Sequence, residues 1–465
     1  MTMSKSSIGK FIMVLLFGAF IVLTACDEDN NVNKDMTNVE TNDDHSGNLD
    51  HDENEQNVDE DNLEPVTLLM MTHWNDGQFE HHFKNHLEEK YPHITLEHVR
   101  ATKDDIEEEV FAKDLKPDII MTSVDNYYLD IDLLLDLNPL IDSFNFDLDR
   151  LDPSIVNYLE EMSNEGELNG LPFVRPEYAL VYNPDIFDMF GVDYPTDNMT
   201  WDEVIELARQ VTGEKNGVQF RGLHPGLPGL FEFMLQQVEN SHLVDPDTHE
   251  PVIEQNEPFK IYLQRLETIY SIPGNEMNPG DGEGLDERAV NVMRRGQLAM
   301  AADRAFASTY ADKSAETGLN FDFVTYPRWG GEHGDYGPNE PGNGLVVTTI
   351  SEHPEEAFRA IEYFLSDEYQ TWQAAEGNVP AVVSQEVRDA YLQENEHYDI
   401  LKDKNLAAIT NAQPAPLPIK SQYESEILGD TNYGEDLANG EDINTIIRKM
   451  QEQAEGKAKE IQSKQ

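Results

Sequence analysis

The sequence predicts an α/β protein with two lobes, each of them a mainly parallel β-sheet flanked by helices. The chain has 465 residues, which is enough for two or three domains. Strand and helix patterns alternate both before and after the stretch 170–183. In that stretch Pro172 and Pro176 exclude a helix, and a β-favouring run from Tyr178 to Tyr182 follows. We therefore expect this stretch to connect the lobes, and a cleft between lobes commonly binds a small ligand.

The first 25 residues have the pattern of an export signal. Lys5 and Lys10 supply a basic start, and the apolar run 11–22 is too short to span a bilayer comfortably. Leu23-Thr24-Ala25-Cys26 then resembles the lipobox of bacterial lipoproteins. The resemblance implies that residues 1–25 are a signal peptide and that Cys26 becomes the lipid-bearing first residue; the alternative is a plain secretory signal with a chance cysteine. Cys26 is the only cysteine, so the chain forms no internal disulfide.

Residues 26–64 are predicted to be an acidic, disordered tether. From Asp27 to Glu64 the sequence is almost free of apolar residues, and Lys34 is its only Lys or Arg. Such a segment buries too little apolar surface to offset the entropy lost on ordering.

The charge of the whole chain also limits its partners. It has 91 acidic and 32 basic residues, a formal net charge of −59. A negative field of this size repels nucleic acid and anionic lipid, and we expect neither as a partner.

The folded part of the chain is expected to start at Pro65, where the patterns of buried strands and amphipathic helices begin to alternate. This spacing is typical of a parallel sheet. The loop 122–128 would then lie at the carboxyl end of the third strand, a favoured ligand position in open sheets. Strands are predicted at 66–71, 94–99 and 117–121, with helices at 79–90 and 104–112.

The second half of the chain shows the same alternation. Thr200 and Glu203 form the pattern of a capping box, which predicts that a helix starts at Trp201. We expect Trp201 itself to pack in the core rather than contact a ligand. Helices are predicted at 185–190, 201–211, 231–238, 258–270, from 353 and at 442–462, and strands at 297–302 and 321–326.

Several short motifs, in this order, resemble those of one protein family. The stretch 170–183 is similar to a GLP…ALYYN segment, and 200–208 begins like a TWDE helix. His353-Pro354-Glu355-Glu356-Ala357 is similar to an HPEAA helix start, and 377–381 to a GG-LPA segment. These segments resemble the family 1 extracellular solute-binding proteins, maltose-binding-protein-like lipoproteins of carbohydrate ABC transporters. The resemblance covers about residues 65 to 460.

The resemblance implies a periplasmic-binding-protein fold of class II with a multi-strand hinge. It implies lobe 1 in residues 65–172 and 327–350, and lobe 2 in residues 173–326 and 351–465. It also implies a lipid-anchored monomer on the extracellular face of the cell membrane, without catalytic residues, cofactor or metal. Such a receptor delivers a sugar, expected to be an oligosaccharide, to the permease subunits of an ABC importer. The alternatives are a secreted glycoside hydrolase and a receptor of the same fold for a peptide or a metal.

Ligand contacts are expected from side chains in loops that face the predicted cleft. Aromatic rings bind the apolar face of a sugar, and charged or amide groups bind its hydroxyls. The residues with this placement are Trp74, Asp125, Asn126, Arg175, Tyr178, Asp303, Arg304, Phe306, Trp329 and Asn343. Each of these side chains could instead fill the core or pair within the chain. Trp329 is the preferred stacking ring, because it stands between Arg328 and two glycines, outside any helix or strand pattern.

Arg175, Arg304 and Arg328 all fall in the predicted cleft segments, although the chain is poor in basic residues. One hypothesis is an anionic ligand such as a uronate oligosaccharide, held by bidentate contacts. The alternative is that these arginines pair with carboxylates of the chain. Phe306 stands where the resembled family usually has Trp, which leaves stacking possible but removes the indole N–H.

Replacing Cys26 with Ser should leave a folded protein but release it from the cell. The reason is that the lipobox cysteine is the predicted lipid attachment point, and a single lost anchor abolishes retention. The measurement is the distribution of the protein between membrane and medium. Continued membrane retention of the variant would show that another segment anchors the chain.

Overall fold

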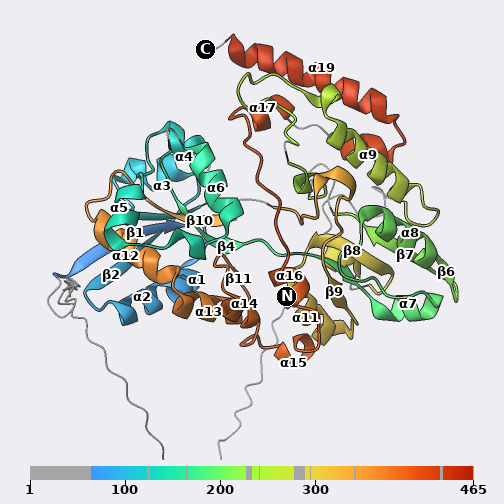
Figure 1. The fold of residues 1–465 in the computed structure, drawn as a ribbon, viewed down its shortest axis with the longest axis horizontal. Coiled ribbons are helices and arrows are strands. Elements are labelled where there is room, and N and C mark those ends of the chain that lie inside the picture. Colours follow the sequence, from blue (N-terminus) through green and yellow to red (C-terminus); the bar gives the residue numbers. More distant parts are fainter. Residues whose placement is uncertain are drawn as a thin grey trace, which may run out of the picture. The chain divides into compact units, whose positions relative to one another are not determined.

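The computed structural model describes residues 64–122, 126–163, 166–226, 233–239, 241–276, 289–293, 295–339, 342–429 and 433–463. Within these residues the chain forms two β-sheets, each with its own helices, which confirms the predicted two-lobed α/β fold class (Figure 1). Both sheets belong to one compact unit, 61–465. The predicted signal peptide, Cys26 and nearly all of the predicted tether lie outside the described residues.

The first sheet has the strand order β11-β4-β10-β3-β1-β2. β1 pairs in parallel with β2 and β3, whereas β10 lies antiparallel between β3 and β4. The strands are β1 (Val66–Thr72), β2 (Ile94–Arg100), β3 (Ile119–Thr122), β4 (Leu171–Arg175), β10 (Asn343–Val347) and β11 (Val379–Pro380).

The second sheet has the strand order β6-β7-β8-β5-β9. β7 and β8 are parallel, and β5 is antiparallel to both β8 and β9. Both sheets are therefore mixed rather than mainly parallel, because each contains strands that arrive from the other sheet. The strands are β5 (Tyr178–Tyr182), β6 (Gly213–Lys215), β7 (Val218–His224), β8 (Leu298–Arg304) and β9 (Asp322–Val324).

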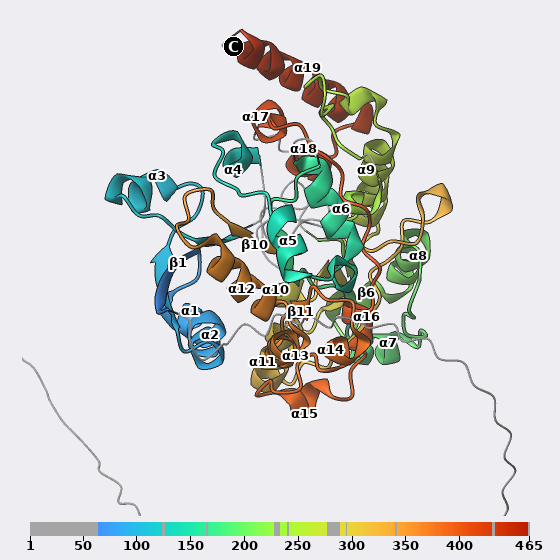
Figure 2. The ribbon, with the colours of Figure 1, turned by 60° about the vertical axis from the view of Figure 1, so that its left-hand side comes forward.

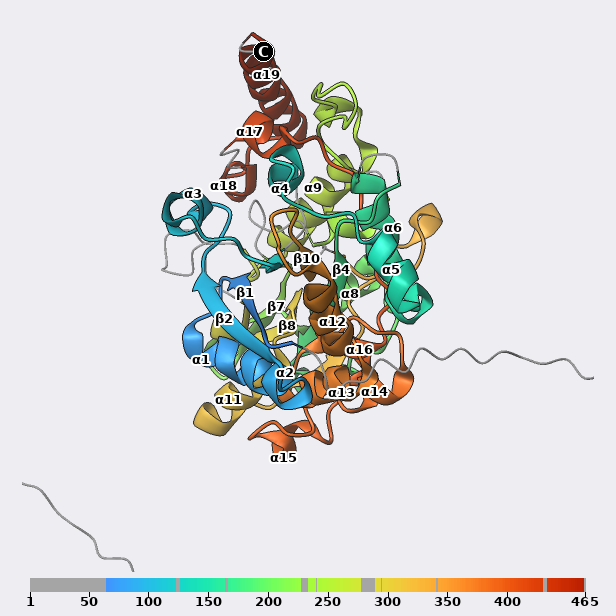
Figure 3. The ribbon, with the colours of Figure 1, turned by 90° about the vertical axis from the view of Figure 1, so that its left-hand side faces the viewer.

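The helices that pack on the first sheet come from both ends of the chain. The rings of His86 and Trp372 lie 3.9 Å apart between α2 and α13, and Figure 3 shows these two helices next to each other. Between α1 and α2 the helix widens into a π-helical turn, Glu80–Lys84. This group comprises α1 (Asp76–Phe79), α2 (Asn85–Lys90), α3 (Ile106–Glu109), α4 (Asn126–Asp130), α5 (Asn138–Phe144), α6 (Pro153–Met162), α12 (Pro354–Phe364), α13 (Asp367–Glu376) and α14 (Gln385–Asp389).

A second group of helices packs on the second sheet. The long C-terminal helix α19 contacts α9, α17 and α18, and Figure 2 shows it beside them. The group comprises α7 (Pro184–Phe190), α8 (Trp201–Val211), α9 (Glu257–Tyr270), α10 (Ala289–Met293), α11 (Ala307–Thr317), α15 (Tyr398–Leu401), α16 (Ala407–Thr410), α17 (Glu424–Leu428), α18 (Tyr433–Ala438) and α19 (Ile443–Gln462). The helix expected over 231–238 is, in its described part, a 3₁₀ turn at Leu235–Gln237.

Local chemistry explains where α8 starts. The Thr200 side chain accepts a hydrogen bond from the Glu203 backbone N–H, and the Glu203 carboxylate accepts one from the Thr200 N–H at 2.8 Å. This reciprocal pair is the predicted capping box. Trp201 is fully buried, and its indole N–H donates to Gln237 Oε1 at 2.8 Å. Trp201 therefore packs in the core, as predicted.

The segment 351–465, which the resemblance placed in lobe 2, divides between the sheets. Phe358, Ile361 and Phe364 of α12 are fully buried in the core of the first sheet, and β11 pairs with β4. The short connection 348–353 after β10 explains this correction, since it returns α12 to the sheet that contains β10. β4 is also a strand of the first sheet, although the expected boundary cut it at residue 172.

Three connections join the two sheets. β4 is separated from β5 by only Pro176 and Glu177. The second connection runs from β9 to β10, and the third leads from β11 to α15 and α16, which pack on the second sheet. The first connection is so short that the end of β4 and the start of β5 must be close together.

Buried amide side chains hold these connections in place. Gln237 is fully buried and donates from Nε2 to the carbonyl oxygens of Pro327 and Tyr336, both at 2.7 Å. Gln370, also fully buried, donates to the Phe173 and Phe364 carbonyls and accepts from the Ala381 N–H. Because each amide satisfies backbone groups that would otherwise be buried without partners, it stabilises the connection it contacts.

Replacing Gly222 with Ala should destabilise the second sheet. A Cβ at this position of β7 would lie 2.3 Å from the Ala208 carbonyl oxygen and 2.4 Å from Thr212 Oγ1, so strand and helix α8 would have to separate. Overpacking of this kind costs about 1–3 kcal/mol. The measurement is chemical denaturation, with Gly456→Ala in α19 as a matched control.

In that control nothing lies within 4 Å of the added Cβ, and alanine is the better helix former by up to about 1 kcal/mol. Gly456→Ala should therefore be neutral or stabilising. Equal stability of the Gly222 variant and the parent would show that β7 and α8 are not in the close contact described.

Candidate functional site

One edge of the first sheet carries several of the predicted ligand residues. Trp74 follows the carboxyl end of β1, and Arg175 ends β4. β10 runs in the opposite direction and begins at this edge, where Asn343 pairs with Val174 and Gly344 with Thr122. The sheet register therefore brings Trp74, Arg175 and Asn343 to the same edge. The Trp74 ring is half-buried, 4.8 Å from the ring of His82.

Two further predicted residues belong to the loop that leaves this edge after β3. Asp125 lies outside the described residues, and Asn126 is the first residue of α4. Their contribution to a site stays a prediction.

The facing edge of the second sheet carries the remaining group. Tyr178 opens β5 and pairs with Arg304 at the end of β8, and Ala179 pairs with Asp303. Tyr178 and Asp303 are largely buried, whereas Arg304 and Phe306 are partly exposed. The Arg304 guanidinium lies 5.8 Å from the centre of the Phe233 ring. Four predicted residues thus meet at one edge.

The two edges meet at the shortest connection between the sheets. Arg175 ends β4 and Tyr178 begins β5, with Pro176 and Glu177 between them. A small pocket opens here, and its wall also includes residues of the second connection and of the segment formed by α16 and the residues that follow it. It is lined by Arg175, Pro176, Tyr178, Gly337, Pro338, Asn339, Ile409, Ala412 and Pro414. Of the predicted residues, the pocket contains Arg175 from the first sheet and Tyr178 from the second.

Phe306 has a backbone conformation that few residues adopt. Its φ of 37° and ψ of 56° are left-handed, a region that costs a non-glycine residue energy. It directly precedes α11, in the loop that leaves β8 at the site edge. Such strain often occurs where a side chain is held in place for binding. The half-buried ring of Phe306 remains a good candidate for stacking.

Arg175 and Arg328 form ion pairs with carboxylates of the chain. Arg175 Nε lies 3.1 Å from Asp152 Oδ2, both side chains are 6% exposed, and Arg175 Nη2 donates to the Ala412 carbonyl. Arg328 Nη1 lies 2.7 Å from Asp335 Oδ2. These ion pairs are the alternative to an anionic ligand. Arg175 and Arg328 therefore give no support to the hypothesis that the ligand is anionic.

Trp329 does not lie in the candidate site, contrary to the prediction. It is 2% exposed and belongs to the core cluster of the second sheet. The Arg265 guanidinium from α9 stacks 4.4 Å from the centre of its ring and donates to its carbonyl oxygen at 2.7 Å. The prediction failed because these partners are distant in sequence.

Two residues that the sequence analysis did not select also lie at the site. Glu177, between the two prolines and β5, accepts the Ala307 N–H on its Oε2 at 3.1 Å, and its carbonyl accepts the Ala305 N–H. Burial raises the pKa of its carboxyl group. Its position in the connecting stretch was the available signal.

His224 is the second such residue, at the carboxyl end of β7. Its Nδ1 accepts the Gly226 N–H at 3.2 Å, so its proton is on Nε2. Burial, with a smaller effect of Arg221, lowers its pKa to about 3, and the ring is neutral at neutral pH. Nothing in the local sequence marks this residue, because its burial depends on the whole sheet.

Comparison with known protein families gives a match for the chain. The chain matches the family Bacterial extracellular solute-binding protein over residues 76–371, more than half of its length. Comparison with curated proteins gives no match.

Solved structures show the fold. A sugar transporter from Rhizobium etli in an open conformation is 18% identical, with a TM-score of 0.67 over 84% of this chain and 99% of that chain. The sugar-binding protein MalE from Xanthomonas citri is 16% identical, with a TM-score of 0.65 over 85% and 98%. The cyclic alpha-maltosyl-1,6-maltose binding protein from Arthrobacter globiformis is 15% identical, with a TM-score of 0.63 over 85% and 100%.

Replacing Trp329 with Ala should destabilise the ligand-free protein strongly. The substitution removes a buried indole and exposes the stacked Arg265 guanidinium, and truncations of buried tryptophan cost about 3–5 kcal/mol. The measurement is the free energy of unfolding from denaturant titration. A variant as stable as the parent would show that Trp329 does not stabilise the core, and Trp329 would again be a candidate ligand contact.

Acidification should destabilise the protein partly through His224 and His82. Burial lowers the pKa of His224 to about 3 and that of His82 to about 4, while the unfolded chain takes up these protons near 6.5. The stability that the neutral rings provide is therefore complete above pH 6.5 and is lost as the pH falls below it. Each group contributes a slope of about 1.4 kcal/mol per pH unit.

The check is the free energy of unfolding at pH 7, 6 and 5 for the parent and for His224→Asn, whose amide oxygen can accept the Gly226 N–H. The slope of the variant between pH 6 and 5 should be shallower by about 1.4 kcal/mol per unit. Equal slopes would mean that His224 is protonated in the folded protein.

Proposed function

The chain belongs to the bacterial extracellular solute-binding proteins, and on that premise we propose that it is the receptor that delivers a carbohydrate to an ABC importer. The observation that supports this most directly is the meeting of two sheet edges at a two-residue connection. Each edge carries aromatic and polar side chains. A ligand that contacts the side chains of both edges stabilises the arrangement of the lobes in which both edges reach it.

The ligand chemistry that fits this site is a neutral oligosaccharide. The half-buried Phe306 offers aromatic surface, and Asp303 and Asn343 offer hydrogen-bonding groups at the same edges. Arg175 is already paired with Asp152, so a carboxylated sugar would have to displace that buried ion pair. The names of two similar structures include neutral oligosaccharides, cycloalternan and cyclic alpha-maltosyl-1,6-maltose.

The proposal places the protein on the outer face of the cell membrane, held by lipid on Cys26. The support is the lipobox sequence Leu23-Thr24-Ala25-Cys26 together with the extracellular family. Among the described helices, none has the length and apolar composition needed to cross a bilayer. The permease subunits of an importer would then be its membrane partners, and the receptor itself would act as a monomer.

The test is calorimetric titration with a panel of neutral α- and β-linked oligosaccharides and one uronate oligosaccharide. At least one neutral oligosaccharide should bind without being hydrolysed. Phe306→Ala and Asp303→Asn should each weaken binding roughly tenfold or more, as substitutions of binding hot spots do. Met189→Ala, at an exposed position of α7, is the control and should bind like the parent.

Two results would contradict the proposal. Release of smaller sugars during the titration would indicate a hydrolase. Binding of the uronate alone would indicate that Arg175 leaves Asp152 to hold an anionic ligand.

A further inference from the structure

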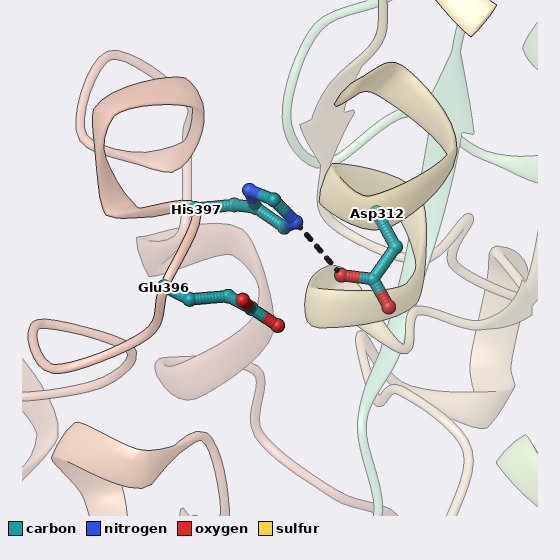
Figure 4. Close-up of side chains that lie close together, drawn as sticks. All are labelled: Asp312, Glu396 and His397. Carbon is teal, nitrogen blue, oxygen red and sulfur yellow. Dashed lines mark ion pairs between the residues drawn. The ribbon is translucent and has the colours of Figure 1, made fainter. Parts of the chain in front are cut away.

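A cluster of two carboxylates and one imidazole lies outside the candidate sugar site. Asp312 comes from α11, whereas Glu396 and His397 come from the loop that leads into α15 (Figure 4). His397 Nε2 lies 3.3 Å from Asp312 Oδ1, and one ligand atom from each of the three residues lies within 4.8 Å of the others. Among the described residues this is the only such group of three.

The local structure holds the imidazole in this position. Asn395 Oδ1 accepts the backbone N–H of His397 at 2.9 Å, and His397 directly precedes the first turn of α15. Its Nε2 faces Asp312 Oδ1, so this nitrogen and the carboxylate oxygen can bind the same ion. The Asp312 side chain is 49% exposed and that of His397 is 28% exposed, so an ion can reach the cluster from solvent.

The charge of the cluster favours a cation. Two carboxylates close together repel each other, and a cation bound between them relieves this repulsion. The adjacent lysines do not supply the missing charge: Lys313 lies 2.7 Å from Glu316, and Lys402 lies 2.6 Å from Asp399. The cluster therefore has three ligand groups and two carboxylates, while these two lysines pair with other carboxylates.

We propose that Asp312, Glu396 and His397 bind a divalent transition-metal ion, with zinc as the best-matched ion. Zinc binds imidazole nitrogen and carboxylate oxygen at about 2.0–2.2 Å, so two ligand atoms on a tetrahedral ion are about 3.4 Å apart. The observed 3.3 Å between His397 Nε2 and Asp312 Oδ1 fits this spacing. The exposed Glu396 closes the third position by a side-chain rotation, and water completes the site.

A bound ion would fasten two parts of the second lobe to each other, α11 and the loop that leads into α15. α11 begins directly after Phe306 at the sugar-site edge, and the loop with Glu396 and His397 belongs to the third connection between the sheets. The ion would thus fix the third connection against the helix that follows the site edge. This role is independent of whether the protein binds sugar.

The experiment is a thermal melt of the full chain, purified without a polyhistidine tag, with ZnCl₂ or with EDTA. Zinc should raise the midpoint of the parent by at least about 2 °C, because an ion that binds only the folded state stabilises it. His397→Ala and the isosteric Asp312→Asn should each abolish most of this rise. Titration calorimetry should show one zinc site in the parent that either substitution removes.

The matched control is His81→Ala. His81 also faces a single carboxylate, Glu376, at 3.2 Å and is exposed, but among the described residues it belongs to no group of three ligands. This variant should keep the full zinc response. The proposal is wrong if the parent shows no response to zinc, or if its response survives in both Asp312→Asn and His397→Ala, which would assign the ion to another part of this acidic chain.

Discussion

The two-residue connection between β4 and β5 is the constraint on which the rest of the site depends. Both strands are buried members of their sheets, and Pro176 and Glu177 allow no slack between them. The edge of the first sheet that contains Arg175 therefore lies next to the edge of the second sheet that contains Tyr178. The proline fixes one φ angle, and Glu177 is tied through its carbonyl and carboxylate to the start of α11. Arg175 and Tyr178, the residues that flank the connection, are thus held close together.

Although the chain is very acidic, uncharged side chains form several of the buried hydrogen bonds at the connections. Burying a carboxylate requires a partner cation, and the chain has few to offer, with 91 acidic against 32 basic residues. Gln237 and Gln370 instead use uncharged amides to satisfy backbone groups at the connections. Arg175 with Asp152 is the buried ion pair next to the site, and it explains why this arginine is not available to a ligand.

The parts of the fold that depend on local chemistry could be predicted from the sequence. The capping box of Thr200 and Glu203, the apolar run of β5 and the alternation of strands and helices needed no knowledge of distant contacts. The predictions that failed were non-local. Trp329 is covered by Arg265 from another helix, and α12 returns to the first sheet rather than joining the second. His224 escaped notice for the same reason, since only the assembled sheet buries it.

The position of β10 has a consequence for how the chain acquires its structure. This strand lies between β3 and β4, and Leu345 pairs with both Met121 and Leu171. All strands of the second sheet lie between β4 and β10 in the sequence. The first sheet therefore cannot be completed during synthesis until all of these strands have been made. Contacts so far apart in sequence form slowly, because closing the intervening loop costs entropy before any pairing compensates for it. We expect the second sheet to form first as a unit of nearly continuous sequence, and the exposed edges of β3 and β4 to await the late strand. A chain of this design gains from an acidic surface, since like charge keeps incompletely folded molecules apart during that interval.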